Sequence, residues 1–560
     1  MRHDVDYRVV DLDEDEGLFF LTGDHRAFLV DRELGDRLRR GLDHLTDDER
    51  AEWRTLVDRG LVSSVNRDVL RASTAEDGAD LAINVNLTNV CNLACTYCFA
   101  DGGDYGRITE AMGSDSVDHI FAFVERHLTP SRSVRLEFFG GEPLANFPVL
   151  RAVCDGSERF AAEHGVRFVY RISTNLTLLP EGVLDLFARH RFIVSVSIDG
   201  CREAQDANRP AKGGQGSYDR VIRNVHAVRA ASEDITLVAR MTVARREPSL
   251  SHNVRELWKL NVFDYFQIYP GVFPVDDDGS PTGTGGRSPG GPVFVEIGRR
   301  PPADELATPA TPATPATQGT WGTGGCGAAA SASSAKRHVN FFLQDGMVEQ
   351  FREFLRTYPS LFTPENRFKG VLEYERTAQM VLEGRLALAF CSGGRTYFTH
   401  SPNHSISPCH RLVGEPDFDV GTGETGLTRS VADWRRSVDS HPVCGRCWAR
   451  YLCGGGCKQE NHVATGDIGV LNDESCRYQL LLAEEVLRMV GRSSPDYRDR
   501  DRRRFDDLFV SCGRPVVPNH RVGTERVHLA GLHHFRPVLP MPRPAPEPVS
   551  SARNQDGGRR

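Results

Sequence analysis

The sequence predicts an α/β protein whose central part is a barrel built from six βα units. Strand-like and amphipathic helical segments alternate between residues 81 and 272, and parallel strands need helical connections of this kind. Both ends of the chain lack this alternation, so they form additional units. The pattern is typical of a partial (β/α)6 TIM-like barrel, in which the chemistry lies at the carboxyl ends of the strands.

Residues 1–75 form a small α+β unit in front of the barrel. Residues 7–12 and 17–23 have the apolar character of short strands, while 31–42 and 46–62 have the period of amphipathic helices. Thr46 followed by Glu49 is a capping-box pattern, which predicts the start of the second helix.

The barrel itself occupies residues 81–272. The strand-like segments are residues 81–88, 133–140, 167–174, 192–199, 235–243 and 262–270. The helical segments between them include residues 114–128, 180–190 and 217–231, and Ser114 and Ser217 stand where N-caps are expected.

The remainder of the chain divides by composition. Residues 275–336 are rich in Pro, Gly, Ala and Thr, so they cannot bury enough apolar surface to order themselves, and we expect a disordered insert. A helical connector follows over residues 337–387, and a cysteine-rich module spans residues 388–490. Residues 497–560 are an Arg/Pro-rich tail that we expect to be mostly a solvated extension.

Composition limits the cellular setting. The net charge of -8 gives no general signal for nucleic-acid or membrane binding. The acidic N-terminus has no apolar core of a secretion signal, and no apolar run is long enough to cross a bilayer. We therefore expect a soluble cytoplasmic protein with neither nucleic acid nor membrane among its partners.

Fourteen cysteines are informative in a reducing compartment, where clustered thiols indicate metal ligands more often than disulfides. Ten of them fall in two regions, while Cys154, Cys201, Cys326 and Cys512 stand alone and are interpreted as incidental thiols. The clustered cysteines are Cys91, Cys95 and Cys98 near the front, and Cys391, Cys409, Cys444, Cys447, Cys453, Cys457 and Cys476 near the back.

The front cluster directly follows the first barrel strand. The C-x3-C-x2-C spacing lets Cys91, Cys95 and Cys98 bind three corners of a [4Fe–4S] cube and leaves the fourth iron open for another ligand. Chance or a zinc site are the alternatives, but zinc requires a fourth protein ligand for a closed site. The position after the first strand of a βα repeat favours the iron–sulfur interpretation.

The pattern resembles the radical S-adenosylmethionine superfamily, whose signature has this spacing with an aromatic residue before the last cysteine. The resemblance implies that a [4Fe–4S] cluster and S-adenosylmethionine are cofactors, and that Glu142 with its neighbouring backbone holds the methionine amino group. It further implies that the segment Ser173 to Asn175 approaches the ribose and carboxylate, and that Arg240 pairs with the carboxylate. The cofactor-binding residues it predicts are Tyr97, Gly140, Gly141, Glu142, Ser173, Asn175, Asp199 and Arg240.

The rear cysteines are similar to the SPASM extension of enzymes that modify peptides and proteins, which binds two auxiliary [4Fe–4S] clusters. The resemblance assigns Cys391, Cys409 and Cys457 to the first cluster, and Cys444, Cys447, Cys453 and Cys476 to the second. A zinc ribbon is the alternative. His404 replaces a glycine that is frequent in the family, and the fourth ligand of the first cluster stays open between a substrate thiolate and an unassigned residue.

Strands followed by helices in residues 1–75 resemble the winged-helix-like recognition element of peptide-modifying enzymes, which adds a leader peptide to a sheet edge. A structural cap on the barrel is the alternative. DNA binding is disfavoured because the unit is acidic.

Together these resemblances imply a radical peptide maturase that abstracts hydrogen from a ribosomally made precursor peptide and forms a thioether or other crosslink. A flavodoxin- or ferredoxin-type protein is the expected low-potential electron donor. An anaerobic sulfatase-type maturase that makes formylglycine is one alternative, and a non-catalytic iron–sulfur scaffold is another. No residue beyond the cluster is assigned a catalytic role.

Overall fold

The computed structural model describes most of the chain but not all of it. The described residues are 6–23, 25–62, 80–103, 110–275, 337–344, 346–498, 516–518, 522–527, 532–538 and 541–544. The disorder predicted for residues 275–336 falls outside them, apart from Val275 at the end of a strand.

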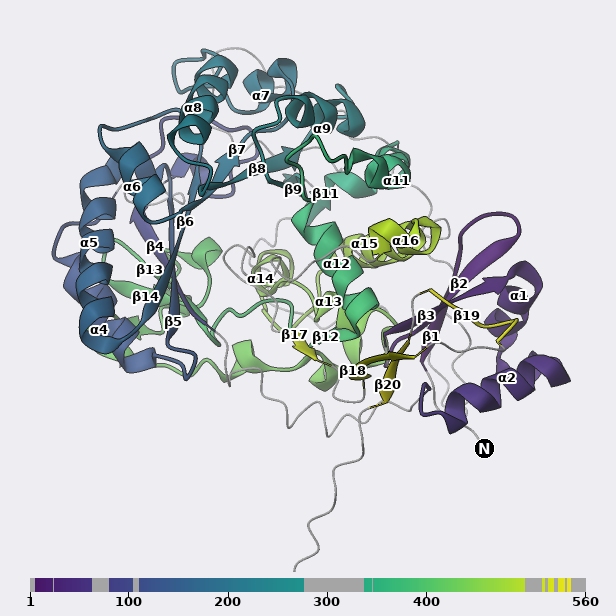
Figure 1. The fold of residues 1–560 in the computed structure, drawn as a ribbon. Coiled ribbons are helices and arrows are strands. Elements are labelled where there is room, and N and C mark those ends of the chain that lie inside the picture. Colours follow the sequence, from purple (N-terminus) through teal and green to yellow (C-terminus); the bar gives the residue numbers. More distant parts are fainter. Residues whose placement is uncertain are drawn as a thin grey trace, which may run out of the picture.

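The six predicted barrel strands are present, parallel and adjacent in chain order (Figure 1), which confirms the predicted α/β partial barrel. They are β4 (Leu81–Thr88), β5 (Ser133–Gly140), β6 (Arg167–Thr174), β7 (Ile193–Ser197), β8 (Thr236–Val243) and β9 (Tyr265–Pro270). Among the strands that were not predicted, β13 (Tyr397–His400), from the cysteine-rich region, pairs in parallel with β4 and continues the sheet beyond it.

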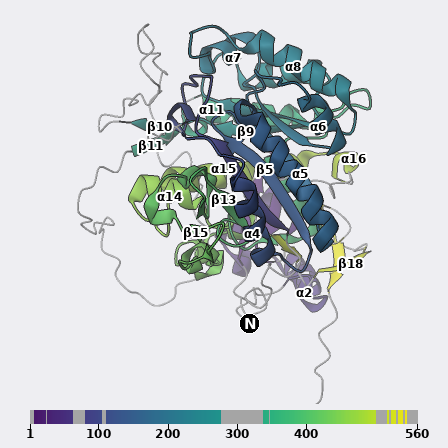
Figure 2. The ribbon, with the colours of Figure 1, turned by 90° about the vertical axis from the view of Figure 1, so that its left-hand side faces the viewer.

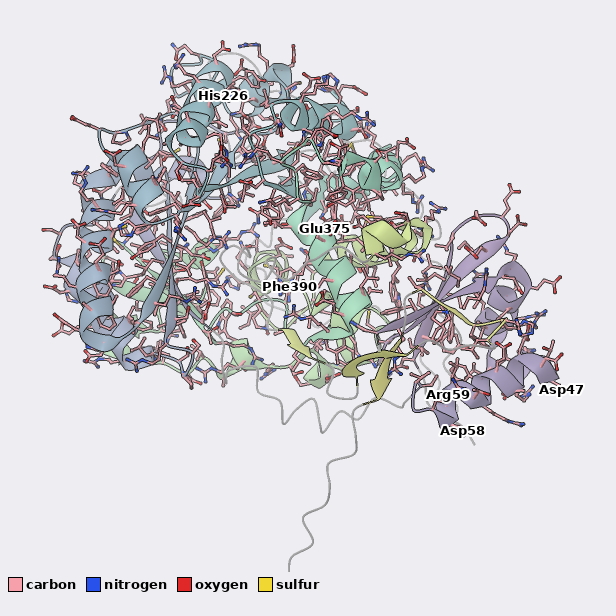
Figure 3. The ribbon with its side chains drawn as sticks, in the orientation of Figure 1. Asp47, Asp58, Arg59, His226, Glu375 and Phe390 are labelled. Carbon is pink, nitrogen blue, oxygen red and sulfur yellow. The ribbon has the colours of Figure 1, made fainter. Side chains whose placement is uncertain are left out.

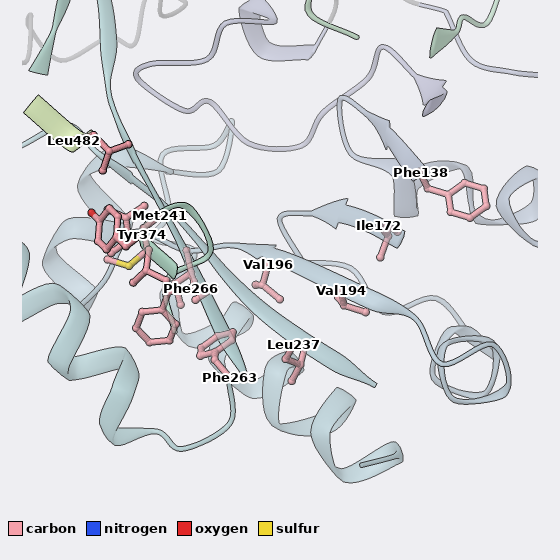
Figure 4. Close-up of a cluster of buried hydrophobic side chains, with 14 of the residues drawn as sticks. Phe138, Ile172, Val194, Val196, Leu237, Met241, Phe263, Phe266, Tyr374 and Leu482 are labelled. Carbon is pink, nitrogen blue, oxygen red and sulfur yellow. The ribbon is translucent and has the colours of Figure 1, made fainter. Parts of the chain in front are cut away.

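Helices cover the outer face of this curved sheet (Figures 1 and 2). They are α4 (Ser116–His127), α5 (Phe147–His164), α6 (Val183–Arg189), α7 (Arg202–Asn208), α8 (Tyr218–Ala231) and α9 (Leu250–Lys259). Side chains at alternate strand positions, such as Phe138, Ile172 and Val194, form the main core (Figure 4). Because strand side chains alternate between faces, the intervening positions point to the concave face, where the site lies.

The connector and the cysteine-rich region cross the open side of the barrel. Their longer helices are α11 (Met347–Thr357), α12 (Leu372–Glu383) and α15 (Asp473–Arg492), with the shorter α13 (Arg450–Cys453), α14 (Lys458–Thr465) and α16 (Pro495–Arg498). Strand β10 (Val272–Val275) follows the barrel and pairs with β11 (Arg337–Asn340) of the connector. The other strands of these two regions are β12 (Arg385–Ala387), β14 (Ser405–Ser407), β15 (Gly421–Thr422) and β16 (Gly426–Leu427). The tail supplies β17 (Val516–Pro518), which pairs with β12, and the mutually paired β18 (Val522–Val527) and β20 (Met541–Pro544). The strands β14, β15 and β16 extend the large sheet from β13, so the barrel and the cysteine-rich region share one sheet.

The N-terminal unit is an antiparallel sheet covered by two helices. Its elements are β1 (Tyr7–Asp11), β2 (Glu16–Leu21), β3 (Arg26–Asp31), α1 (Arg32–Arg40) and α2 (Asp47–Asp58). The predicted capping box is present at the start of α2, where Thr46 and Glu49 bond reciprocally. Asp47, Asp58 and Arg59 lie exposed at the outer side of this helix (Figure 3).

Strand β2 shows how this unit attaches to the rest. Leu18 and Phe20 belong to the main core, whereas Phe19 and Leu21 pack with α1 and α2 in a separate core. Arg8 and Asp6 reinforce the attachment through ion pairs of 2.9 Å with Glu484 on α15 and 2.6 Å with Arg450 on α13. Both faces of the small sheet are therefore covered.

Part of the Arg/Pro-rich tail differs from the expected solvated extension. Residues 532–538 include strand β19 (Arg536–Pro537), which pairs with β3 and completes a sheet of order β1-β2-β3-β19. Phe535 is fully buried there, because its ring packs among the apolar side chains of the small core of the N-terminal unit. Among the described residues, no helix has the combination of length and apolarity that crossing a membrane requires.

Candidate functional site

The first cysteine loop lies at the carboxyl end of β4. Cys91, Cys95 and Cys98 are free, partly exposed thiols. The backbone of the segment after α7 holds this loop: Ala94 N donates to Pro210 O at 2.8 Å, and Thr96 N donates to Asn208 O at 2.9 Å. The loop is thus clamped on the side of β7 and α7.

Two glycines hold the same loop from the side of β5. The Gly141 N–H donates to Thr88 O at 2.7 Å, and the Glu142 N–H donates to Val90 O at 2.8 Å. A Cβ on Gly141 would lie 2.3 Å from the Val90 carbonyl oxygen. A Cβ on Gly140, whose φ is +135°, would lie 2.3 Å from Thr88 O. The Gly-Gly pair is therefore needed for the close approach of two backbones.

The Glu142 carboxylate points into the protein and is fully buried. It accepts hydrogen bonds from Thr174 Oγ1 at 2.6 Å, Asn175 N at 2.7 Å and Leu144 N at 3.0 Å. Burial raises its pKa to about 7, although these three donors oppose the rise. The side chain ties the ends of β5 and β6 together, while its predicted contact with the methionine amino group stays a prediction.

Asn175, just beyond β6, is aimed at the cysteine loop. Its Nδ2 lies 3.8 Å from Cys91 Sγ and 2.9 Å from Asn92 Oδ1, while its Oδ1 accepts from Thr177 N at 2.9 Å. The side chain is held at both ends, so an amide N–H is directed at a predicted ligand sulfur. Ser173 lies two residues earlier, in register with Ser195 of β7.

Asp199 follows β7 and joins three elements. Its carboxylate accepts from Tyr97 Oη, from Arg209 Nε at 3.0 Å and from Thr242 N at 2.9 Å. The Arg209 guanidinium also lies 5.2 Å from the Tyr97 ring centre. Burial raises the pKa of Tyr97 well above its usual value, and the Asp199 charge adds to this, while Arg209 opposes it. Tyr97 is thereby fixed between Cys95 and Cys98.

Arg240 lies on the concave face of β8, in register with Ser197 and Gln267. Its guanidinium is 5.7 Å from the Tyr269 ring centre, and burial lowers its pKa. The structure thus brings Arg240 to the same end of the barrel as Asp199, whose side chain bonds the neighbouring strand residue Thr242.

Three polar residues on the concave face of the sheet were not among the site residues predicted from the sequence. Asn84, Glu137 and Arg171 lie side by side on β4, β5 and β6. Arg171 is 2% exposed and its Nη1 lies 4.0 Å from Glu137 Oε1, while no hydrogen bond to its guanidinium is found in the described part of the chain. Burial lowers its pKa to about 10. These residues could have been predicted to lie in the site, because they are polar residues at alternate positions of otherwise apolar strands.

The charge interactions among the rear cysteines fall into two sets. Burial raises the pKa of Cys409 to about 12, and the charge of Cys391 adds to the rise. Burial also raises the pKa of Cys457, and the charges of Cys409 and Cys391 are among the causes that raise it further. Burial likewise raises the pKa of Cys444 and of Cys476 to about 12, and the charges of Cys453 and Cys447 raise both pKa values further. These charge interactions agree with the predicted division into Cys391, Cys409 and Cys457 on one side and Cys444, Cys447, Cys453 and Cys476 on the other, which stays a prediction.

The glycine run between Cys453 and Cys457 shapes both groups. Gly454, Gly455 and Gly456 all have positive φ, of 80°, 100° and 80°. A Cβ on Gly454 would lie 2.4 Å from the Ala389 backbone, just before Cys391. Only glycine allows this close approach.

His404 stands at the position where the resemblance leads one to expect glycine. Its φ is +64°, a left-handed conformation that favours glycine. The centre of its imidazole lies 4.2 Å from that of His119, with the two rings tilted, and its Nε2 lies 3.3 Å from Asp115 Oδ2 on the barrel side.

The donor chemistry fits the predicted clusters. Thiols are the ligands that iron–sulfur clusters use, and three of them stand on one loop with an amide N–H directed at Cys91. Among the described residues, no three His, Cys, Asp or Glu side chains are arranged to hold a single metal ion.

Comparison with known proteins identifies the central domain. Residues 85–248 match the family model described as the Radical SAM superfamily. The chain is 24% identical over 190 residues to the cysteine-type anaerobic sulfatase-maturating enzyme of Clostridium novyi, covering 33% of this chain and 50% of that protein. It is 27% identical over 153 residues to the serine-type enzyme of Klebsiella aerogenes, covering 26% and 36%. The chain thus spans about half or less of the length of these relatives.

The fold is also similar to that of a solved structure. Native anSMEcpe with bound AdoMet and Cp18Cys peptide aligns with a TM-score of 0.51 and 15% sequence identity, over 74% of this chain and 98% of that chain. At this identity the likeness concerns the fold, and it extends beyond the barrel into the cysteine-rich region.

Proposed function

We propose, given that residues 85–248 are a domain of the Radical SAM superfamily, that the chain is a peptide maturase. The observation that carries the proposal is the combination of one cysteine loop at the barrel end with seven further clustered cysteines in the region that continues the barrel sheet through β13. A cluster held by Cys91, Cys95 and Cys98 would supply the electron that cleaves S-adenosylmethionine.

The residues of the chain then have separate tasks. Gly140 and Gly141 let the cofactor loop approach β5, and Asn175 directs an N–H to Cys91. Asp199 and Arg209 hold Tyr97, and so set the loop between Cys95 and Cys98. Arg240 at the same end of the barrel supplies a positive charge for the carboxylate of the cofactor.

The rear groups would accept the electron that the substrate gives up. Abstraction of a hydrogen leaves a carbon radical on the peptide. When this radical forms a bond to a cysteine thiolate of the same peptide, one electron is released. A cluster would accept this electron, either at Cys391, Cys409 and Cys457 or at Cys444, Cys447, Cys453 and Cys476. The product has lost two hydrogens. A soluble low-potential protein of the flavodoxin or ferredoxin type would supply the first electron.

A second candidate function is supported by the relatives. Both sulfatase-maturating enzymes are similar to this chain in sequence, and the structure of similar fold holds AdoMet and a peptide. Formylglycine formation on a Cys or Ser of a sulfatase is therefore the alternative. The N-terminal sheet unit favours the leading proposal, because a sheet edge is a common means of binding an extended peptide.

Product analysis separates the two functions. The reconstituted enzyme is incubated with S-adenosylmethionine, a reductant and one of two peptides. The first is any short cysteine-containing precursor found to be encoded beside its gene, and the second is a sulfatase-derived peptide. We expect the first peptide to lose two hydrogens and one alkylatable thiol. An aldehyde that reacts with hydrazide on the second peptide, with no change in the first, supports the alternative instead.

A further inference from the structure

The outer edge of β3 is covered by a segment from the far end of the chain (Figure 1). Arg536 pairs with Leu29 and Pro537 with Phe28 in antiparallel register, and Val538 N donates to Ala27 O at 3.1 Å. The pairing covers only two residues of β19, so backbone bonds alone hold it weakly.

Two side chains, those of Phe535 and Glu52, anchor residues Leu532–Val538 to the N-terminal unit. The Phe535 ring is fully buried, with its centre 5.7 Å from that of Phe19 and 6.0 Å from that of Trp53. The Glu52 carboxylate on α2 accepts three successive backbone N–H groups, from His533 at 2.9 Å, His534 at 3.0 Å and Phe535 at 3.3 Å.

This arrangement defines the ligand that the groove between β3 and α2 takes. Backbone pairing and the Glu52 contacts tolerate almost any sequence, because they use only main-chain groups. The aromatic pocket is selective, because a large flat ring fills it. The chemistry therefore fits an extended peptide with one aromatic anchor.

We propose that this groove is a peptide-binding surface that residues Leu532–Val538 occupy in cis, and that a substrate peptide displaces them through its own aromatic residue. The inference rests on the proposed function for its substrate class. A tethered segment competes at a high effective concentration, so the apparent affinity for a free peptide is reduced by the fraction of molecules whose groove is open.

The test uses the full-length, cluster-loaded chain and a fluorescein-labelled synthetic peptide with the sequence of Leu532–Val538. Phe535→Ala removes the cis anchor, so we expect the peptide to bind this variant at least tenfold more tightly than the wild type, by fluorescence anisotropy. A peptide with alanine in place of its phenylalanine should lose that binding. Equal affinity for wild type and Phe535→Ala overturns the proposal.

A second pair of variants tests the groove itself. In the Phe535→Ala background, Glu52→Ala should weaken peptide binding at least tenfold, because three N–H groups lose their acceptor. Asp58→Ala, on an exposed acid of the same helix, is the matched control and should bind as Phe535→Ala does. Equal effects of the two changes contradict the assigned groove.

Hydrogen–deuterium exchange of the wild type needs no variant and covers the case in which Phe535→Ala fails to fold. The amides of residues 533–535 and 538 should exchange much more slowly than those of the free peptide, and fast exchange overturns cis occupancy. Peptide binding needs no S-adenosylmethionine. Binding without 5′-deoxyadenosine formation therefore defeats the proposed function alone, while 5′-deoxyadenosine formation without binding defeats this inference alone.

Discussion

Gly141 carries the closest backbone approach at the candidate site. Because an added Cβ would meet Val90 O at 2.3 Å and Cys91 N at 2.9 Å, Gly141→Ala must push the cysteine loop away from β5. Such overpacking costs about 1–3 kcal/mol. We expect the iron content after reconstitution to fall by about 4 atoms per chain, the content of one cluster, and 5′-deoxyadenosine formation to be lost.

Gly35→Ala is the control for this change, because a Cβ there meets Val9 Cγ1 at an ordinary 3.6 Å. It should leave both quantities as in the wild type. Full iron content and full 5′-deoxyadenosine formation in Gly141→Ala would show that the glycine pair does not position the loop.

Removal of the Glu142 carboxylate leaves three buried hydrogen-bond donors without an acceptor. Glu142→Ala strands the Thr174 hydroxyl and the amides of Asn175 and Leu144, and each unsatisfied group costs about 1–3 kcal/mol. The urea midpoint should therefore fall clearly, whereas Glu163→Ala, on an exposed acid of α5, should change it little. A midpoint unchanged by Glu142→Ala would refute the structural role assigned to this carboxylate.

Single residues also mark the limits of local sequence patterns. The capping box at Thr46 and Glu49 was predictable because it depends only on neighbours in the chain. Ser217 stands at the N-cap of α8, but its hydroxyl donates to Arg209 O at 2.7 Å and makes no cap bond. Arg209 itself was missed, because its partner Asp199 approaches it only in the folded protein.

At the scale of elements, the turn between β2 and β3 attaches the N-terminal unit to the rest through His25. The ring is buried, and its Nδ1 lies 3.2 Å from Met380 O at the far end of α12. Burial lowers its pKa to about 4, so the folded protein keeps this histidine neutral down to that pH.

This histidine makes the stability of the protein depend on pH. The unfolded chain binds the proton near pH 6.5, so the contribution is fully present above that value and decreases as pH falls toward 4, by up to about 3 kcal/mol. His400 and His410, whose pKa values burial lowers to about 3, act in the same direction.

His25→Asn keeps a residue that tolerates the observed φ of 47° and removes one titrating group. We expect the free energy of unfolding, measured by urea titration, to fall less between pH 6.5 and 4 than in the wild type. His44→Asn, on an exposed histidine, is the control. Identical pH profiles for His25→Asn and wild type would exclude the burial effect.

Elements were predictable where their pattern is local. The strands β4, β5 and β6 have the predicted bounds, because apolar residues recur along each of them between polar turns, with polar side chains such as Asn84, Glu137 and Arg171 at intervening positions. The strands β13 and β19 were missed, because β13 has four residues and β19 two, and each pairs with a strand hundreds of residues away. The Arg/Pro-rich composition around Phe535 predicted a solvated extension, so the burial of this side chain was not expected from the sequence.

At the scale of the whole molecule, the chain combines the cysteine loop after β4 with a cysteine-rich region that continues the barrel sheet through β13. Replacing Cys391, Cys409 and Cys457 together by alanine should remove about 4 of about 12 irons per chain, while S-adenosylmethionine cleavage continues and peptide modification stops. Cys201→Ala, on a thiol outside these groups, should change neither. Unchanged iron content in the triple variant would refute the first auxiliary group.

The most direct test of the central claim concerns the front loop. The measurement is 5′-deoxyadenosine formation from S-adenosylmethionine and dithionite, by wild type and by the variant with Cys91, Cys95 and Cys98 replaced by alanine, both reconstituted without oxygen. We expect wild type to form it with about 12 irons per chain, and the variant to form none while it keeps about 8. Retained 5′-deoxyadenosine formation in the variant would contradict the account.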